Sequence, residues 1–132
     1  SFLGKSGRGE VAIRIQPSTV QAGNTFEMRV TIRNPRRSPL QLDALYVPLR
    51  LSRAADVLDI TPKPKDRRPT KDGLRLTYNM EVPPQGEVSI IVRLRASQPG
   101  DYVAPLGVEF ARGFVEQPMR VLIQPGEQSQ QP

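Results

Sequence analysis

An unbroken alternation of apolar and polar side chains between Gly23 and Pro35 constrains the fold of this chain more than any other feature. The apolar residues are Phe26, Met28, Val30 and Ile32, and the polar residues that alternate with them are Glu27, Arg29, Thr31 and Arg33. Because successive side chains of a β-strand point to opposite faces, this period of two predicts a half-buried strand. Turn residues at both ends bound the segment, as expected for a strand.

Further alternating segments follow along the chain. We expect strands at 11–16, 26–33, 40–51, 57–60, 74–82, 88–96, 102–110 and 114–124. Turns are expected at Gly23-Asn24, Asp72-Gly73, 83–86 and 97–101. Within 40–51 the apolar positions change parity, which predicts a β-bulge near Asp43-Ala44 or a corner between two strands. Pro48 predicts that part of this strand lies at a sheet edge, because proline donates no ladder hydrogen bond.

The spacing of these segments predicts the fold class. Short strands at intervals of about 8–12 residues, without a clear helix, are typical of a sandwich. We therefore predict an all-β domain, an antiparallel immunoglobulin-like β-sandwich of about seven to eight strands, with a closed barrel as the alternative. A single helical turn at 54–58 is an alternative to the short strand at 57–60. Residues 61–72 are predicted to form a long exposed loop.

The predicted organisation has three parts. Residues 1–10 are Gly-rich and polar and are expected to form a flexible N-terminal arm or linker. The sandwich is expected to span 11–124. Residues 125–132 are expected to form a polar C-terminal tail.

The composition narrows the chemistry that this chain can perform. Its 132 residues include no cysteine and no histidine, and its 14 prolines and 10 glycines lie between the apolar runs. Without cysteine the chain has no disulfide and no thiolate metal site, and without histidine it lacks the usual general base and metal ligand. No apolar run approaches the roughly 18 residues of a membrane-spanning helix, so we expect none.

The remaining residues offer little for catalysis or metal binding. Acid–base catalysis needs a carboxyl group in an apolar pocket, whereas Asp66 lies next to two arginines. Asp56 and Asp59 flank a short predicted strand and do not form the D-x-D-x-D-G pattern of a calcium loop. We therefore expect no catalytic residue, no metal site, no cofactor and no small-molecule substrate, and we do not expect an enzyme.

Cations are concentrated in two stretches between predicted strands. The chain carries 19 Lys and Arg against 13 Asp and Glu, for a formal net charge of +6. If the two stretches share one end of the sandwich, their cations could bind an acidic polymer, an anionic lipid surface or an acidic protein. A solvated loop is the structural alternative. No aromatic residue is interleaved, so sequence-specific nucleic-acid binding is not expected. The candidate binding residues are Arg36, Arg37, Lys63, Lys65, Arg67, Arg68 and Lys71.

Three segments together resemble bacterial immunoglobulin-like modules of the CARDB kind and their conserved-repeat relatives. The first is the strand from Gly23 to Asn34, opened by glycine and closed by asparagine. The second is the Pro/Gly turn and strand at 82–90, and the third is the Pro-Gly-Asp-Tyr-Val stretch at 99–103. The resemblance covers about residues 15–110. It implies a non-catalytic piece of a secreted or surface protein that acts as a spacer, an adhesive unit or a platform.

Two functions remain open from the sequence. The first is a non-catalytic immunoglobulin-like module that serves as a structural, adhesive or protein-interaction unit of a larger secreted or cell-surface protein or assembly. Its partners would be other protein modules or subunits, and its location extracellular, cell-surface or periplasmic. The alternative is a basic module that binds anionic polymer or membrane head groups through the loops at 36–37 and 63–71.

Overall fold

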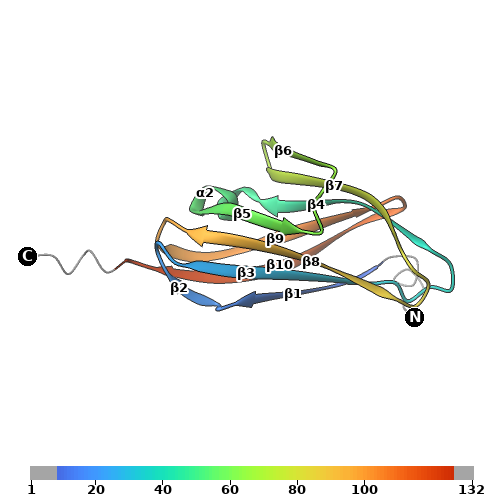
Figure 1. Ribbon diagram of the computed structural model, residues 1–132, viewed down its shortest axis with the longest axis horizontal. Helices are drawn as coiled ribbons and strands as arrows, with labels where there is room; N and C mark the ends of the chain where they lie inside the picture. Colours follow the sequence, from blue (N-terminus) through green and yellow to red (C-terminus); the bar gives the residue numbers. More distant parts are fainter. Residues whose placement is uncertain (1–8, 127–132) are drawn as a thin grey trace, which may run out of the picture.

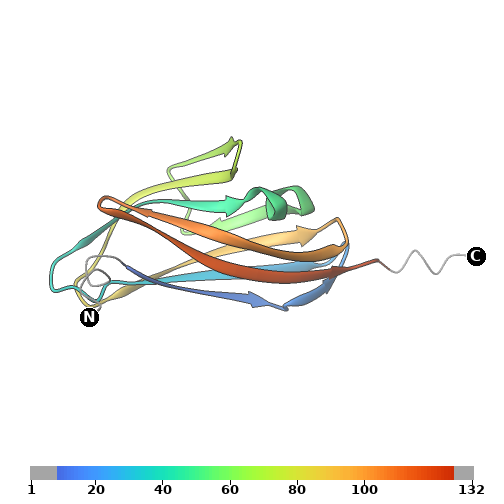
Figure 2. The same ribbon diagram turned by 180° about the vertical axis from the view of Figure 1, so that it is seen from behind.

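Two β-sheets packed face to face form the body of the protein (Figures 1 and 2). The computed structural model describes residues 9–126. The four-stranded sheet consists, in spatial order, of β1 (Glu10–Gln16), β3 (Thr25–Arg33), β8 (Glu87–Ala96) and β5 (Ala55–Thr61). The six-stranded sheet consists, in spatial order, of β2 (Thr19–Gln21), β10 (Gly113–Gln124), β9 (Gly100–Phe110), β4 (Leu40–Pro48), β7 (Gly73–Val82) and β6 (Asp66–Thr70).

This arrangement confirms the predicted all-β sandwich. The strands form two separate sheets, so the closed-barrel alternative is wrong. All strand pairs are antiparallel except β2 with β10, which are parallel. β1 begins at Glu10, one residue before the expected start of the sandwich. Residues 1–8 and 127–132, most of the predicted arm and tail, lie outside the described residues.

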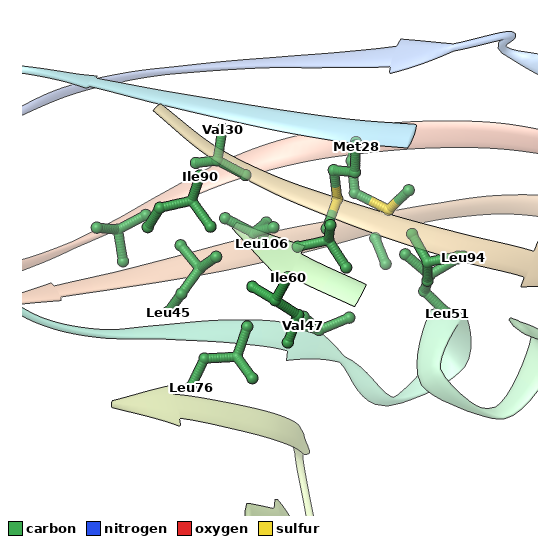
Figure 3. Packing of buried hydrophobic residues seen from close by; sticks show 14 of the residues in the cluster. Met28, Val30, Leu45, Val47, Leu51, Ile60, Leu76, Ile90, Leu94 and Leu106 are labelled. Carbon is green, nitrogen blue, oxygen red and sulfur yellow. The ribbon is translucent and has the colours of Figure 1, made fainter. Parts of the chain in front are cut away.

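The space between the sheets is filled mostly by aliphatic side chains. The half-buried strand predicted from the alternation in β3 is confirmed, because Phe26, Met28, Val30 and Ile32 are all buried. Figure 3 shows Met28 and Val30 from one sheet facing Leu45, Leu76 and Leu106 from the other. Burial of such side chains is the main favourable contribution to folding. None of these side chains carries an acidic, basic or nucleophilic group.

Residues 9–126 contain ten strands where about seven to eight were expected, because two connections contain short edge strands. β2 lies between the first two expected strands and pairs with the end of β10. β6 lies within 61–72, which is therefore not a loop throughout. Proline and charged residues are compatible with an edge strand, since one of its sides needs no ladder partner. β2 has three residues and β6 has five, which are too few for an alternation to be recognised in the sequence.

A short helix, α2 (Leu49–Ala54), replaces the end of the strand expected at 40–51. Pro48 ends β4 with extended backbone and forms the N-cap of α2. Leu51 and Ala54 are three residues apart, so they share a helix face, and both are buried. The apolar residues at 49 and 51 fit a strand equally well, which is why the sequence analysis predicted that the strand continues to residue 51. The short strand expected at 57–60 lies within β5 (Ala55–Thr61), so the alternative of a helical turn at 54–58 is wrong.

The predicted bulge is confirmed. The register of β4 shifts between Leu42 and Ala44 against both of its neighbours, so Asp43 is the irregular residue. The shift explains why apolar positions on the two sides of Asp43 have opposite parity. Pro48 follows the last pair of β4 with β9, at Tyr46 and Gly107, and thus lies where β4 has a neighbour on one side only.

Asn34 ties two inter-sheet connections together at one end of the sandwich. It is the one buried polar residue in the described part of the chain. Its side-chain amide donates to the carbonyl oxygens of Ser38 (2.8 Å), Val82 (3.1 Å) and Pro83 (3.2 Å). Its Oδ1 accepts a bond of 2.9 Å from the backbone N–H of Arg36. The loop between β3 and β4 is thereby fixed to the turn between β7 and β8.

The single helix of residues 9–126 is far too short to cross a bilayer, and no apolar helix of membrane-spanning length occurs there.

Candidate interaction surfaces

The structure separates the two cationic stretches predicted to converge. β6 pairs with the first half of β7, from Gly73 to Thr77. Arg36 lies beyond the other end of β7, where its carbonyl oxygen accepts a 3.0 Å hydrogen bond from the N–H of Gln85. Figure 1 shows the 34–39 loop and the 83–86 turn at the end of the molecule away from β6. Arg36 and Arg37 therefore do not share a site with the 63–71 stretch.

The cations of the 63–71 stretch are themselves divided between two faces. Lys63, Lys65 and Arg67 line a cleft of ≈ 500 Å³ between β5 and β6. Arg68 lies opposite Arg75 in the sheet, on the outer face, and Lys71 lies in the turn between β6 and β7. Three of the seven predicted residues are thus brought together.

A second surface, which the sequence did not reveal, lies on the outer face of the six-stranded sheet. Its centre is Tyr46 on β4, whose hydroxyl donates to Glu109 Oε1 (2.7 Å) and accepts from Arg75 Nε (2.9 Å). Arg75 also donates to Thr77 Oγ1 (2.7 Å), approaches Glu109 Oε2 to 3.6 Å and lies over the Tyr46 ring at 5.6 Å. The hydrogen bond to Tyr46 is the main reason why the pKa of Arg75 is raised. These contacts hold the Tyr46 ring in one orientation.

Phe114 on β10 packs edge-on against this ring, with centroids 5.9 Å apart and an interplanar angle of 64°. Gly107, on the intervening strand β9, makes the contact possible. A Cβ atom on Gly107 would lie 2.6 Å from Phe114 Cζ, so the ring occupies space that any other residue would fill. Edge-to-face pairs of this kind stabilise by about 0.5–1.5 kcal/mol beyond burial. The two rings border a hollow of ≈ 590 Å³ whose other lining residues include Pro48, Arg50, Pro105 and Glu116.

The two strongly exposed large apolar side chains of the described residues both lie on this face. Val103 is 51% exposed and Phe114 is 46% exposed. Their neighbours in sequence, Ala104 and Val115, point inward, so both side chains stand on the outward parity of their strands. We call the surface formed by Tyr46, Val103, Pro105 and Phe114 the outer aromatic face. Exposed apolar side chains gathered on one face of a soluble protein are a feature of interaction sites.

Charged pairs border the outer aromatic face. Arg120 Nε and Nη2 bind the two carboxylate oxygens of Asp101 at 3.0 and 2.9 Å. This hydrogen bonding lowers the pKa of Asp101 below its usual value and raises that of Arg120. Arg50 lies 5.8 Å from the centre of the Tyr102 ring and donates to the Val103 carbonyl oxygen. An apolar centre with a charged rim is the usual build of a protein interface.

The described residues contain no group of three or more Asp or Glu side chains placed to hold a metal ion. Their buried side-chain nitrogen and oxygen atoms are all hydrogen-bonded. Tyr78 points into the core, where its hydroxyl donates to the Pro62 carbonyl oxygen (2.7 Å) and burial raises its pKa to about 12. A phenol held this firmly in its neutral form supports the structure and is poorly suited to proton transfer near neutral pH.

The signal for the outer aromatic face was present but weak. Val103, Pro105 and Gly107 occupy the outward parity of β9, where polar residues are usual. Phe114 likewise occupies the outward parity of β10. Single apolar residues on an outer face are common, and only the pairing of Tyr46 with Gly107 across β4 and β9 shows that these residues are neighbours.

No protein-family model matches the chain, and no curated protein matches it. Solved structures resemble it in fold. The cupredoxin domain of amoB from Nitrosocaldus yellowstonii is 12% identical, with a TM-score of 0.57 over 91% of this chain and 88% of that one. A cohesin module from a family 33 glycoside hydrolase of Clostridium perfringens is 15% identical, with a TM-score of 0.54 over 90% and 98%. At these identities the likeness shows the β-sandwich and nothing more.

Proposed function

We propose that this chain is a non-catalytic β-sandwich module that docks onto another protein module or subunit through its outer aromatic face. It would act as a structural, adhesive or protein-interaction unit of a larger protein or assembly. The observation that carries the proposal is the exposure of Phe114 and Val103 on one face, beside a Tyr46 ring held in place by Arg75 and Glu109. A rigid aromatic centre loses little conformational entropy on binding, and such residues dominate binding energy.

The remainder of the molecule supports a non-catalytic role. The core is mostly aliphatic, and the chain has no His, the usual general base, and no Cys, a common nucleophile. Blue-copper sites use His and Cys ligands, so the cupredoxin likeness gives no reason to expect copper here. The cohesin likeness shows that a sandwich of similar shape exists as a module of a larger enzyme.

The alternative function, a basic module for anionic polymer or membrane head groups, has less support. It required the seven cations to converge, and the structure keeps Arg36 and Arg37 apart from the others. The CARDB-like character of the chain and its extracellular, cell-surface or periplasmic location rest on the resemblance in sequence and stay predictions.

Site-specific photo-crosslinking in the source cells tests the proposal. A photoreactive residue is placed at Phe114, at Val103 and, as a control, at Arg29 on the outer face of the four-stranded sheet. We expect positions 114 and 103 to yield the same adduct, and Arg29 to yield none. Loss of the adduct at Val103 when Phe114→Ser is added would support docking on this face. Equal adducts from all three positions, or none from 114 and 103, would refute it.

A further inference from the structure

The free edge of β1 differs from the other sheet edges of the sandwich. β1 and β5 are the outermost strands of the four-stranded sheet, and β2 and β6 are those of the six-stranded sheet. Figures 1 and 2 show β1 along one side of the molecule, away from β5 and β6. An edge strand exposes unpaired backbone N–H and C=O groups, which soluble proteins usually protect from further strands by shortness, proline, a bulge or charge.

The other three edges carry such protection. β2 has only three residues, and the part of β10 that it leaves uncovered contains Pro118. The register of β5 shifts between Val57 and Asp59. β6 consists of three charged residues followed by Pro69 and a threonine. Each of these features interrupts or discourages the hydrogen-bond ladder of a further strand.

β1 is regular along its whole length. All seven of its residues pair with β3 in one uninterrupted register, from Glu10 opposite Arg33 to Gln16 opposite Glu27. It contains no proline and no glycine. Within residues 9–126 its only ladder partner is β3, and no other backbone hydrogen bond there reaches residues 10–16. Because successive residues of an antiparallel strand point their N–H and C=O groups to opposite sides, about half of these groups in β1 face outward without a partner.

Aliphatic side chains are partly exposed along the same edge. Val11, Ile13 and Ile15 point from β1 toward the core, yet each is only half-buried. The residues opposite them on β3 are fully buried, so the exposure belongs to the free edge. Val115 on β10, the strand of the other sheet that contacts β1, is half-buried as well. A further strand beside β1 would remove apolar surface of these side chains from water.

The charges of β1 leave one cation without a counterpart. Arg14 lies opposite Arg29 on β3, and like charges in directly opposite positions repel each other. None of the ion pairs in the described part of the chain involves Arg14. Glu10, four residues earlier on the same outer face, makes only an exposed pair with Arg33 at 3.7 Å. A carboxylate placed beside Arg14 at the free edge would therefore be favourable.

A second copy of β1 supplies that carboxylate. Two antiparallel copies related by a two-fold axis at Ala12 bring Glu10 of each copy opposite Arg14 of the other. The same register pairs Val11 with Ile13 on the inner face, and the alanines at the axis are too small to obstruct it. Centring the pair one residue later would lose both charge pairs, and centring it two residues later would place the two arginines opposite each other.

We propose that two copies of this chain associate through β1, antiparallel and centred at Ala12, so that their four-stranded sheets join into one continuous sheet. Main-chain hydrogen bonds between the strands would supply affinity, and the two Glu10–Arg14 pairs would fix the register. A single strand pair buries less surface than a standard interface of about 1,600 Å², so the dimer is weak and reversible. The outer aromatic face belongs to the other sheet and is not part of this interface.

Exchange of the two charges tests both the dimer and its register. Glu10→Arg creates two arginine pairs in the homodimer, and Arg14→Glu creates two glutamate pairs. A 1:1 mixture of these two variants restores both opposite-charge pairs in the heterodimer. Sedimentation velocity of the full chain, at about 20–500 µM and about 0.15 M salt, measures the dissociation constants. We expect each single variant to dimerise at least about tenfold more weakly than the unmodified chain, and the mixture to return to within about threefold of it.

The control for the change in net charge is Arg68→Glu, at an exposed position of β6. It alters the charge of the chain as much as Arg14→Glu does, but at the edge of the other sheet, so it should leave the dissociation constant unchanged. Circular dichroism confirms that each variant is folded.

Disulfide crosslinking tests the geometry at the two-fold axis. The chain contains no cysteine, so a single introduced thiol can crosslink only to its own copy in a second chain. In the proposed register the two residues at position 12 lie directly opposite each other, within the Cα separation that a disulfide spans, whereas those at position 16 are roughly 27 Å apart. In a glutathione redox buffer, Ala12→Cys should form covalent dimers at least about tenfold faster than Gln16→Cys, which is also exposed on the outer face of β1.

The proposal is overturned by any of three results. These are a monomer at every concentration up to about 500 µM, a mixture of the two charge variants that dimerises no better than either alone, or equal rates of crosslinking at positions 12 and 16. A dimer that neither charge variant weakens would place self-association on another surface and would also overturn the proposal. None of these results bears on the docking of a partner at the outer aromatic face, which the β1 variants leave intact.

Discussion

Replacing Asn34 by alanine should destabilise the sandwich by about 2–3 kcal/mol. The side chain is fully buried, its Nδ2 lies within hydrogen-bond distance of three carbonyl oxygens, and its Oδ1 accepts from Arg36 N–H. Because the amide has two hydrogens, it donates the equivalent of two bonds, and a net value of about 1 kcal/mol for each of the three bonds gives an upper figure near 3 kcal/mol. Only the bond to Val82 is wholly buried, so water can replace part of the others and lower the loss.

The destabilisation should be global, because Asn34 joins both connections that cross between the sheets at this end. Asn34→Asp keeps the acceptor for Arg36 but turns a carboxylate oxygen toward the Val82 and Pro83 carbonyls, so its loss should equal or exceed that of alanine. Asn24→Asp, at an exposed asparagine, is the matched control and should stay within about 0.5 kcal/mol.

Urea unfolding followed by circular dichroism measures these changes. We expect a lower midpoint for both Asn34 variants with an unchanged m-value, which reports a change in stability rather than in exposed surface. A loss below about 1 kcal/mol for Asn34→Ala would refute the reasoning. So would a loss for Asn24→Asp as large as that for Asn34→Asp.

Three further changes test separate parts of the structure. Burial raises the pKa of Tyr78 to about 12 from an unfolded value near 10, so its phenol favours the folded state below pH 10 and this contribution is lost as the pH rises toward 12. Tyr78→Phe should therefore remove part of the loss of stability at alkaline pH. Identical profiles of stability against pH for the two proteins would contradict this. Gly73→Ala should cost about 3 kcal/mol or more by thermal unfolding, because Gly73 has a φ of +143° and an added Cβ would overlap the Val47 carbonyl oxygen. Gly107→Ala should cost only about 1 kcal/mol, because the exposed Phe114 ring can move aside, and loss of the ring-current shift on the Tyr46 ring protons in NMR spectra checks this movement.

The sequence predicts well those parts of the fold that depend on local alternation. The buried face of β3 and the bulge at Asp43 follow from the parity of apolar residues alone. Where two local patterns coincide, the prediction is wrong: Leu49 and Leu51 satisfy a strand, yet they belong to α2, because Pro48 ends the ladder and Leu51 with Ala54 can be buried together. β2 and β6 are set by partners far along the chain, which a local pattern does not contain.

The candidate surfaces depend still more on long-range placement. The charge of the 63–71 stretch is visible in the sequence, but the parity that places Arg67 in the cleft between β5 and β6 and Arg68 on the outer face follows only from the register with β7. The outer aromatic face joins residues from β4, β9 and β10 that are up to 68 positions apart, from Tyr46 to Phe114. Such a surface can be inferred only once the order of the strands is known.

Hydroxyl-radical footprinting of the isolated chain and of its parent assembly tests the central claim most directly. Phe114 and Val103 are exposed in the isolated chain, and docking of a partner on the outer aromatic face would cover them. We predict a severalfold fall in the oxidation of Phe114 in the assembly, with little change at Ile91 on the outer face of the other sheet. Equal oxidation of Phe114 in the isolated chain and in the assembly would contradict the account.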